Sequence, residues 1–183
     1  MKPKVEKITT AIENPWTRII KEDLVFDSGN KGEYLIVERT PAIAIIPLFI
    51  KDGEPHTALV MQYRHPIAKE VFQFPMGGME QGSDQEKQAI DELKQETGLK
   101  MEKITLLKTY YVDPGLSRQT CVVYVAEGIS SISDQELEET EHGMTVHFTP
   151  VNKLVQMIEN GEICDSWGIA QVFLLLHYLK MLA

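Results

Sequence analysis

The chain has 183 residues, of which 43% are hydrophobic; this composition excludes an intrinsically disordered chain and fits one folded domain, with or without a small appendage. Its formal net charge of −9 argues against attraction to a nucleic-acid polymer or an anionic membrane surface, because both need a basic protein face. The same charge would repel a phosphate-bearing ligand unless a divalent cation or a local arginine lay between them.

The first forty residues are predicted to form short strands. The N-terminus lacks the apolar core of a secretory signal, which predicts a cytoplasmic location. Two strand-like runs at 16–26 and 32–40 flank the polar, glycine-containing turn DSGNKG, and this arrangement predicts a β-hairpin.

A buried sheet and one loop–helix unit are predicted for the next part of the chain. The apolar run at 42–50 is typical of a strand covered on both faces, and 56–64 is the next strand. After the loop PMGG, Ser83 and Asp84 are candidate caps of a helix with an apolar stripe, which ends at Gly98.

The second half of the chain mixes strands and helices without regular alternation. The predicted elements are strands within 104–115 and 118–129, an acidic loop at 134–143, a strand at 144–150, and helices at 151–161 and 168–183. The last helix is shorter than a bilayer span, so we expect it to be buried in a protein that does not cross a membrane. This order predicts an α/β (α+β) sandwich around a mixed sheet rather than a doubly wound parallel sheet.

The two cysteines are too few for a disulfide framework, and Cys121 is interpreted as a small core residue.

The predicted helix carries an unusual polar face. Glu92, Gln95 and Glu96 stand at i, i+3 and i+4, so their side chains share one side of the helix, although like charges at this spacing repel. One interpretation is an ordinary solvated surface, since three lysines lie in the same stretch: Lys87, Lys94 and Lys100. The other is a site for a hard divalent cation such as Mg2+, which prefers oxygen ligands and often bridges to phosphates.

The stretch from Gly77 to Leu99 resembles the Nudix box, G-x5-E-x7-R-E-U-x-E-E-x-G-U, in which U is apolar. The matching positions are Gly77, Glu92, Leu93, Glu96, Gly98 and Leu99. Most of the chain from about residue 40 is similar to the ADP-ribose and nucleoside-diphosphate-sugar pyrophosphatase branch of that superfamily, in the segments ALVMQYRHPIAKEVFQFPMGG, YVDPGLSRQ and LVQMIENGEICDSWGIAQVFLL.

The resemblance implies a Nudix-type α/β/α sandwich around a mixed sheet. It also implies Mg2+-dependent hydrolysis of the pyrophosphate bond of ADP-ribose or a related nucleotide sugar. Residues 1–40 would be a hairpin region for dimerisation and substrate capping, and residues 41–183 the catalytic domain of a homodimer. We expect a small-molecule substrate, with no nucleic-acid polymer and no membrane as partner.

The resemblance further implies a metal site and a water-activating group. Mg2+, or Mn2+ in its place, would be held by Glu92, Glu96 and the Met76 carbonyl, with Gln95 offering a neutral amide oxygen. The catalytic base would be a glutamate of the box or of the acidic loop, where the candidates are Glu138, Glu139 and Glu141. An acidic loop that is merely a solvated surface is the alternative for each of these three.

Four further residues are candidates for substrate binding. Gly77 belongs to the loop of the box, and Arg64 is expected near that loop, where a guanidinium fork suits a pyrophosphate; a salt bridge at the strand end is the alternative. Arg118, in the Pro-Gly loop, is a weaker candidate for the same role. Trp16 would stack on a nucleobase, or else pack in the core or at a subunit boundary.

Three positions depart from the box. Ser83 stands in place of its first glutamate and Asp91 in place of its arginine, two residues that usually brace loop against helix as an ion pair. Gln95 replaces a glutamate that is a principal metal ligand in the family. These departures predict weakened metal binding, and they leave open a second function: a catalytically weak or inactive Nudix-fold protein that binds a nucleotide as a regulator.

Overall fold

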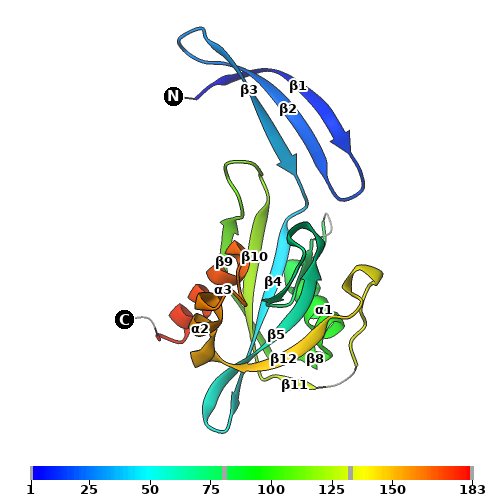
Figure 1. Ribbon diagram of the computed structural model, residues 1–183, viewed down its shortest axis with the longest axis vertical. Helices are drawn as coiled ribbons and strands as arrows, with labels where there is room; N and C mark the ends of the chain where they lie inside the picture. The colour runs from blue at the N-terminus through cyan, green and yellow to red at the C-terminus, as the bar shows by residue number, and fades with distance from the viewer. Residues whose placement is uncertain (1, 80–81, 132–133, 182–183) are drawn as a thin grey trace. The chain divides into compact units, whose positions relative to one another are not determined.

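The computed structural model describes residues 2–79, 82–131 and 134–181, which form two compact units (Figure 1). The N-terminal unit comprises the described residues up to Pro41 together with Tyr110–Cys121. The main unit comprises Ala42–Thr109 and the residues from Val122 onward.

The N-terminal unit contains a three-stranded antiparallel sheet in the order β1-β2-β3. Its strands are β1 (Lys4–Glu13), β2 (Arg18–Val25) and β3 (Lys31–Glu38). The hairpin β2–β3 confirms the prediction from the sequence. Strand β1 is exposed along its whole length, and two register shifts interrupt its pairing with β2. A strand of this kind has no buried face to impose alternation on its sequence.

The main unit is built on a seven-stranded sheet whose central path runs β12-β5-β4-β10-β9. Strands β6 and β7 extend it by pairing with β5 and β4, and β8 pairs with β11 in a separate two-stranded sheet. The strands are β4 (Ala42–Lys51), β5 (Glu54–Arg64), β6 (Lys69–Gln73), β7 (Met76–Gly78), β8 (Leu99–Lys100), β9 (Lys103–Tyr111), β10 (Thr120–Glu127), β11 (Ser130–Ser131) and β12 (Thr145–Pro150).

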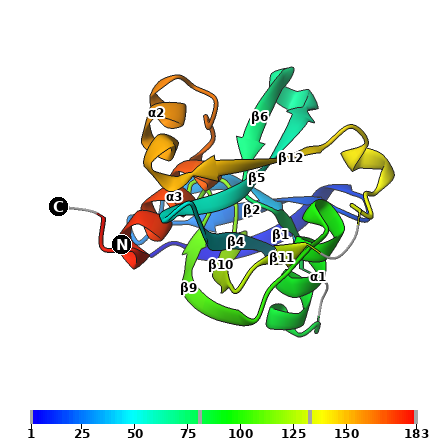
Figure 2. The ribbon, with the colours of Figure 1, turned by 90° about the horizontal axis from the view of Figure 1, so that it is seen from below.

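Helices cover both faces of this sheet, which makes the expected α/β/α sandwich (Figure 2). The helices are α1 (Gln85–Thr97), α2 (Leu154–Glu159) and α3 (Ser166–Tyr178), with short 3-10 turns at His65–Ile67, Glu139–Glu141 and Val151–Lys153. Helix α1 buries Ala89 and Leu93 in a core cluster with Ile43 and Ile45 of β4. Strand β4 is buried on both faces over most of its length, which explains its unbroken apolar sequence.

Both ends of helix α1 follow from local chemistry. Asp84, one of the two predicted caps, is the N-cap of α1, and its Oδ1 accepts hydrogen bonds from the backbone N–H groups of Glu86 and Lys87. Gly98 ends α1 with a φ of +67°, a left-handed conformation that glycine adopts without strain.

Helix α3 buries one side against the rest of the protein, as expected, and exposes the other side. Val172 and Leu175 are buried, whereas Phe173 is 56% exposed. No helix in the described ranges is long and apolar enough to span a membrane.

Candidate active site

The loop that precedes α1 is held against the sheet and against the helix. Strand β7 pairs antiparallel with β4, with Gly77 opposite Ile43, and this pairing places the loop beside α1. A Cβ atom on Gly77 would lie 2.0 Å from Oε1 of Glu92. Only glycine therefore lets the Glu92 carboxylate lie directly against this backbone.

The second glutamate of the box contacts the same loop. Glu96 is 3% exposed, and its Oε2 accepts a hydrogen bond of 3.0 Å from the backbone N–H of Met76. Glu92 is half-buried one helical turn earlier. The structure therefore brings Met76, Gly77, Glu92 and Glu96 together, as the resemblance implied.

Burial and like charges raise the pKa of both carboxyl groups. Burial raises the pKa of Glu92 to about 7, and the charges of Glu141, Glu138 and Asp91 add to this effect. Burial also holds the pKa of Glu96 well above its usual range, with further contributions from Glu92 and Glu141, against the Met76 hydrogen bond and a nearby arginine. Full ionisation of both carboxyl groups is therefore unfavourable unless a cation lies close to them.

Two glutamates of the acidic segment, Glu138 and Glu141, act electrostatically on the glutamates of the box. Glu141 raises the pKa of both box glutamates and Glu138 raises that of Glu92, whereas Glu139 contributes to neither. Glu138 and Glu141 cap the short 3-10 turn reciprocally, which fixes their backbone.

The last turn of α1 anchors this acidic segment. The backbone N–H of Glu136 donates to the carbonyl of Gln95 over 2.8 Å, and the Gln135 amide donates to the carbonyl of Glu96 over 2.6 Å. Lys94 forms a 2.8 Å ion pair with Glu136. The Gln95 side chain is exposed. Sequence reasoning missed these anchors, because nothing local links residues about forty positions apart.

A neutral network stands where the box has its ion pair. Ser83 Oγ donates to Oε1 of Gln88 over 2.6 Å, and the Gln88 amide donates to the carbonyl of Gly78 over 2.5 Å. Asp91 is exposed. Gln88 therefore braces the loop against the helix, a role that the sequence did not reveal.

The donor set fits a hard divalent cation. Within residues 2–79, 82–131 and 134–181, no three or more His, Cys, Asp or Glu side chains are grouped to hold a metal ion. Two carboxylates, Glu92 and Glu96, nevertheless lie against one loop with raised pKa values. Bound Mg2+ or Mn2+ would stabilise the charged forms of these two carboxylates, and a ligand's phosphates and water would complete the coordination.

Arg64 lies close enough to this pocket for its charge to lower the pKa of Glu96. It is the last residue of β5, and its Nε donates a hydrogen bond of 2.7 Å to Oε1 of Gln73.

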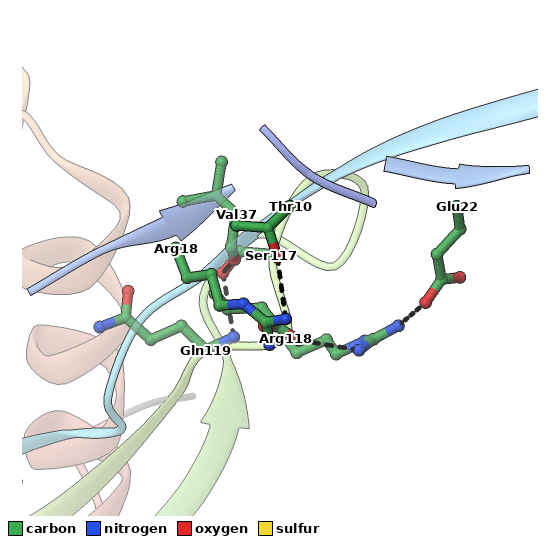
Figure 3. Close-up of polar contacts among 8 residues, drawn as sticks. Thr10, Arg18, Glu22, Val37, Ser117, Arg118 and Gln119 are labelled. Atoms are coloured by element: carbon green, nitrogen blue, oxygen red, sulfur yellow. Dashed lines mark hydrogen bonds and ion pairs between the residues drawn. The ribbon is translucent and has the colours of Figure 1, made fainter. Parts of the chain in front are cut away.

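Arg118 and Trp16 belong to the N-terminal unit. The Arg118 guanidinium forms ion pairs with Glu22 at 2.5 Å and with Glu38 at 2.9 Å, so two carboxylates already neutralise it. Figure 3 shows the first of these pairs, and beside it the hydrogen bond from the Ser117 hydroxyl to the Val37 carbonyl, which ties this loop to β3. Trp16 is 75% exposed, so packing in a core is wrong for it.

Comparisons with known proteins agree with this geometry. The family model described as the NUDIX domain matches residues 38–165. The chain is 27% identical over 146 residues to the ADP-ribose pyrophosphatase of Bacillus subtilis (strain 168), covering 79% of this chain and 77% of that protein. It is 29% identical over 159 residues to the methanol dehydrogenase activator of Bacillus methanolicus, covering 85% and 84%. A solved structure described as an ADP compounds hydrolase shares the fold, with a TM-score of 0.84 at 20% identity over 99% of this chain and 96% of that one.

Proposed function

This chain belongs to the NUDIX domain family, and on that premise we propose that it hydrolyses the pyrophosphate bond of ADP-ribose or a related nucleoside diphosphate sugar. The products would be a nucleoside monophosphate and a sugar phosphate. The observation that carries the proposal is the pair of glutamates on one helical face against the loop at Met76 and Gly77, namely the half-buried Glu92 and the buried Glu96. Similarity to an ADP-ribose pyrophosphatase supports the substrate class.

The metal-binding residues of this proposal are Glu92, Glu96 and the Met76 carbonyl, with the Gln95 amide oxygen as a neutral ligand. When bound, Mg2+ or Mn2+ would neutralise charge on the pyrophosphate and make phosphorus more open to attack. The raised pKa values of Glu92 and Glu96 support this assignment, because a bound cation would stabilise the ionised forms that burial disfavours.

The remaining chemistry falls to side chains of the chain itself. A water molecule forms a bond to phosphorus while the bridging P–O bond breaks, and a glutamate accepts the proton of that water. Glu141 is the first choice, since its charge acts on both box glutamates, with Glu138, Glu139 and the box glutamates as the other candidates. Arg64 binds pyrophosphate oxygens and offsets the negative charge of the pocket.

The N-terminal unit is proposed to serve dimerisation and substrate capping in a cytoplasmic homodimer. Its strand β1 is exposed and carries apolar side chains at Val5, Ile8 and Ile12, which a second copy of the chain would cover. Trp16 is proposed to stack on the nucleobase, and Arg118 to assist substrate binding.

A regulatory protein that binds a nucleotide without rapid turnover is the second candidate. The observation that favours it is Gln95, an exposed amide where the family has a metal-binding carboxylate. Similarity to a protein described as a methanol dehydrogenase activator adds to it.

Turnover of a panel of nucleotide sugars in Mg2+ separates the two candidates. Monophosphate release would be followed for wild type, Gln95→Glu and Glu96→Gln, with the exposed Glu159→Gln as matched control. Hydrolysis predicts turnover that Glu96→Gln abolishes and Glu159→Gln preserves. Regulation predicts tight nucleotide binding without turnover, with activity gained in Gln95→Glu. A wild type that neither binds nor hydrolyses any nucleotide would overturn both.

A further inference from the structure

Two hydrogen bonds link Arg64, through Gln73, to Asp165 at the start of helix α3. Nε of Arg64 donates to Oε1 of Gln73 over 2.7 Å, and Nε2 of Gln73 donates to Oδ2 of Asp165 over 3.1 Å. We propose that Gln73 and Asp165 are positioning residues, which hold the Arg64 guanidinium in the orientation that binds the pyrophosphate. The inference deepens the proposed function and rests on it for the identity of the ligand.

Asp165, at one end of these hydrogen bonds, is held firmly by helix α3. Asp165 is the N-cap of α3, and its Oδ1 accepts hydrogen bonds of 2.9 Å from the backbone N–H groups of both Trp167 and Gly168. A Cβ atom on Gly168 would lie 2.7 Å from Cγ2 of Ile163, so this first helical turn is closely packed. One oxygen of Asp165 therefore fixes the helix and the other fixes Gln73.

Gln73 connects Arg64 to this fixed residue. It is the last residue of β6 and is 7% exposed, so its polar atoms need partners within the protein. The Gln73 carbonyl oxygen accepts the hydrogen bond from Arg64, and the Gln73 amide nitrogen donates the one to Asp165. Only one orientation of the amide group therefore makes both bonds. Because Nε of Arg64 takes part, the plane of its guanidinium is fixed as well, and pyrophosphate recognition depends on that plane.

The choice of a neutral side chain has a further consequence. Arg118 meets two carboxylates directly, which neutralise its charge. Gln73 stands between Arg64 and Asp165 in this series of hydrogen bonds, so Asp165 acts on Arg64 through a neutral side chain. A carboxylate at position 73 would pair directly with Arg64 and would face Asp165 as a like charge.

Kinetics with ADP-ribose test the assignment. Losing one hydrogen bond to a charged group predicts a KM raised about tenfold in Gln73→Leu, with kcat changed much less. Gln73→Glu has nearly the same shape and should also raise KM, because a carboxylate in contact with Arg64 competes with the pyrophosphate for its guanidinium. Asp165→Asn keeps the cap of α3 but weakens the acceptor for Gln73, so it should raise KM by a smaller factor. An unchanged KM in all three variants would overturn the proposal.

A double substitution separates positioning from a general loss of stability. If Gln73 acts through Arg64, then Gln73→Leu should raise KM in the wild-type background and have no further effect on KM in Arg64→Ala. Equal effects in the two backgrounds would show that Gln73 acts independently of Arg64.

A readout without substrate distinguishes failure of this inference from failure of the proposed function. NMR of the ligand-free protein reports hydrogen exchange at the Nε–H of Arg64, with the signal assigned by its loss in Arg64→Lys. We expect slow exchange in wild type and faster exchange in Gln73→Leu and Asp165→Asn. Exchange that is unchanged in both variants would refute the positioning role, whether or not ADP-ribose is hydrolysed. Absence of turnover in wild type would count against the proposed function alone.

Discussion

Removing the charge of Glu92 should alter how the stability of the metal-free protein depends on pH. A carboxyl group whose pKa is higher in the folded protein binds more protons there than in the unfolded chain, between the two pKa values. Stability therefore falls as pH rises through that interval, which for Glu92 runs from 4.5 to about 7. Below pH 4.5 Glu92 does not destabilise the folded protein, and above about pH 7 its destabilising effect on the folded protein is at its full size.

The size of the effect follows from the same pKa. Each tenfold change in proton affinity corresponds to about 1.4 kcal/mol, and part of the side chain reaches solvent, so we expect about 2 to 3 kcal/mol. In EDTA, the free energy of unfolding of wild type should fall by about that much more between about pH 4 and pH 8 than that of Glu92→Gln. Carboxyl groups far from Glu92 contribute equally to both proteins and cancel in the difference. Glu96 does not cancel, because the charge of Glu92 raises its pKa, and removing that charge enlarges the difference between the two proteins.

Urea denaturation across that pH range, in EDTA and then in Mg2+, measures the pH effect of Glu92 and the stabilisation by Mg2+. Mg2+ should restore the stability of wild type at high pH, because it binds only the folded protein, and should restore much less in Glu92→Gln. The exposed Glu159→Gln serves as control and should follow wild type. Parallel pH curves for wild type and Glu92→Gln would refute the interpretation of Glu92 as a buried, uncompensated carboxylate.

Three further substitutions test other parts of the structure. Gly77→Ala should displace the Glu92 carboxylate and weaken Mg2+ binding at least about tenfold by calorimetry; binding equal to that of wild type would contradict the packing described. Gln88→Leu should lower the free energy of unfolding by about 1 to 2 kcal/mol by removing the neutral brace, and thermal denaturation would detect no change if the brace is unimportant. Arg118→Leu should cost about 3 kcal/mol by leaving Glu22 buried and unpaired, and adding Glu22→Leu should recover most of that loss; a second loss of similar size would exclude the ion pair as the cause.

Local patterns were enough to predict the elements that frame the site. The unbroken apolar run of β4, the cap at Asp84 and the left-handed glycine at the end of α1 are each determined within a few residues. The i, i+4 spacing of Glu92 and Glu96 likewise fixes a shared face on any helix. Predictions of this kind depend on the local backbone geometry, so contacts between distant residues have little influence on them.

The contacts that complete the site could not be read in the same way. Gln73 and Asp165 lie 92 positions apart, and their bond exists because α3 begins beside the end of β6. Nothing in either residue's neighbourhood distinguishes it from a surface amide or an ordinary cap. The brace formed by Gln88 spans only ten positions, but it depends on how the loop folds back, which no periodicity encodes.

The three departures from the Nudix box are better understood together than singly. The pattern places two negative charges and one positive charge at these positions, whereas this chain has Ser83, Asp91 and Gln95, so the net charge over the three is −1 in both cases. What changes is where the charge lies: it moves from the face that would bind metal to the exposed Asp91, whose effect on the pKa of Glu92 is smaller than those of burial, Glu141 and Glu138. The net charge at these positions is therefore unchanged, but a bound cation meets a weaker attraction from them and has one fewer charged ligand. Restoring a carboxylate at position 95 should for that reason tighten metal binding and, by the same repulsion, lower the stability of the metal-free protein.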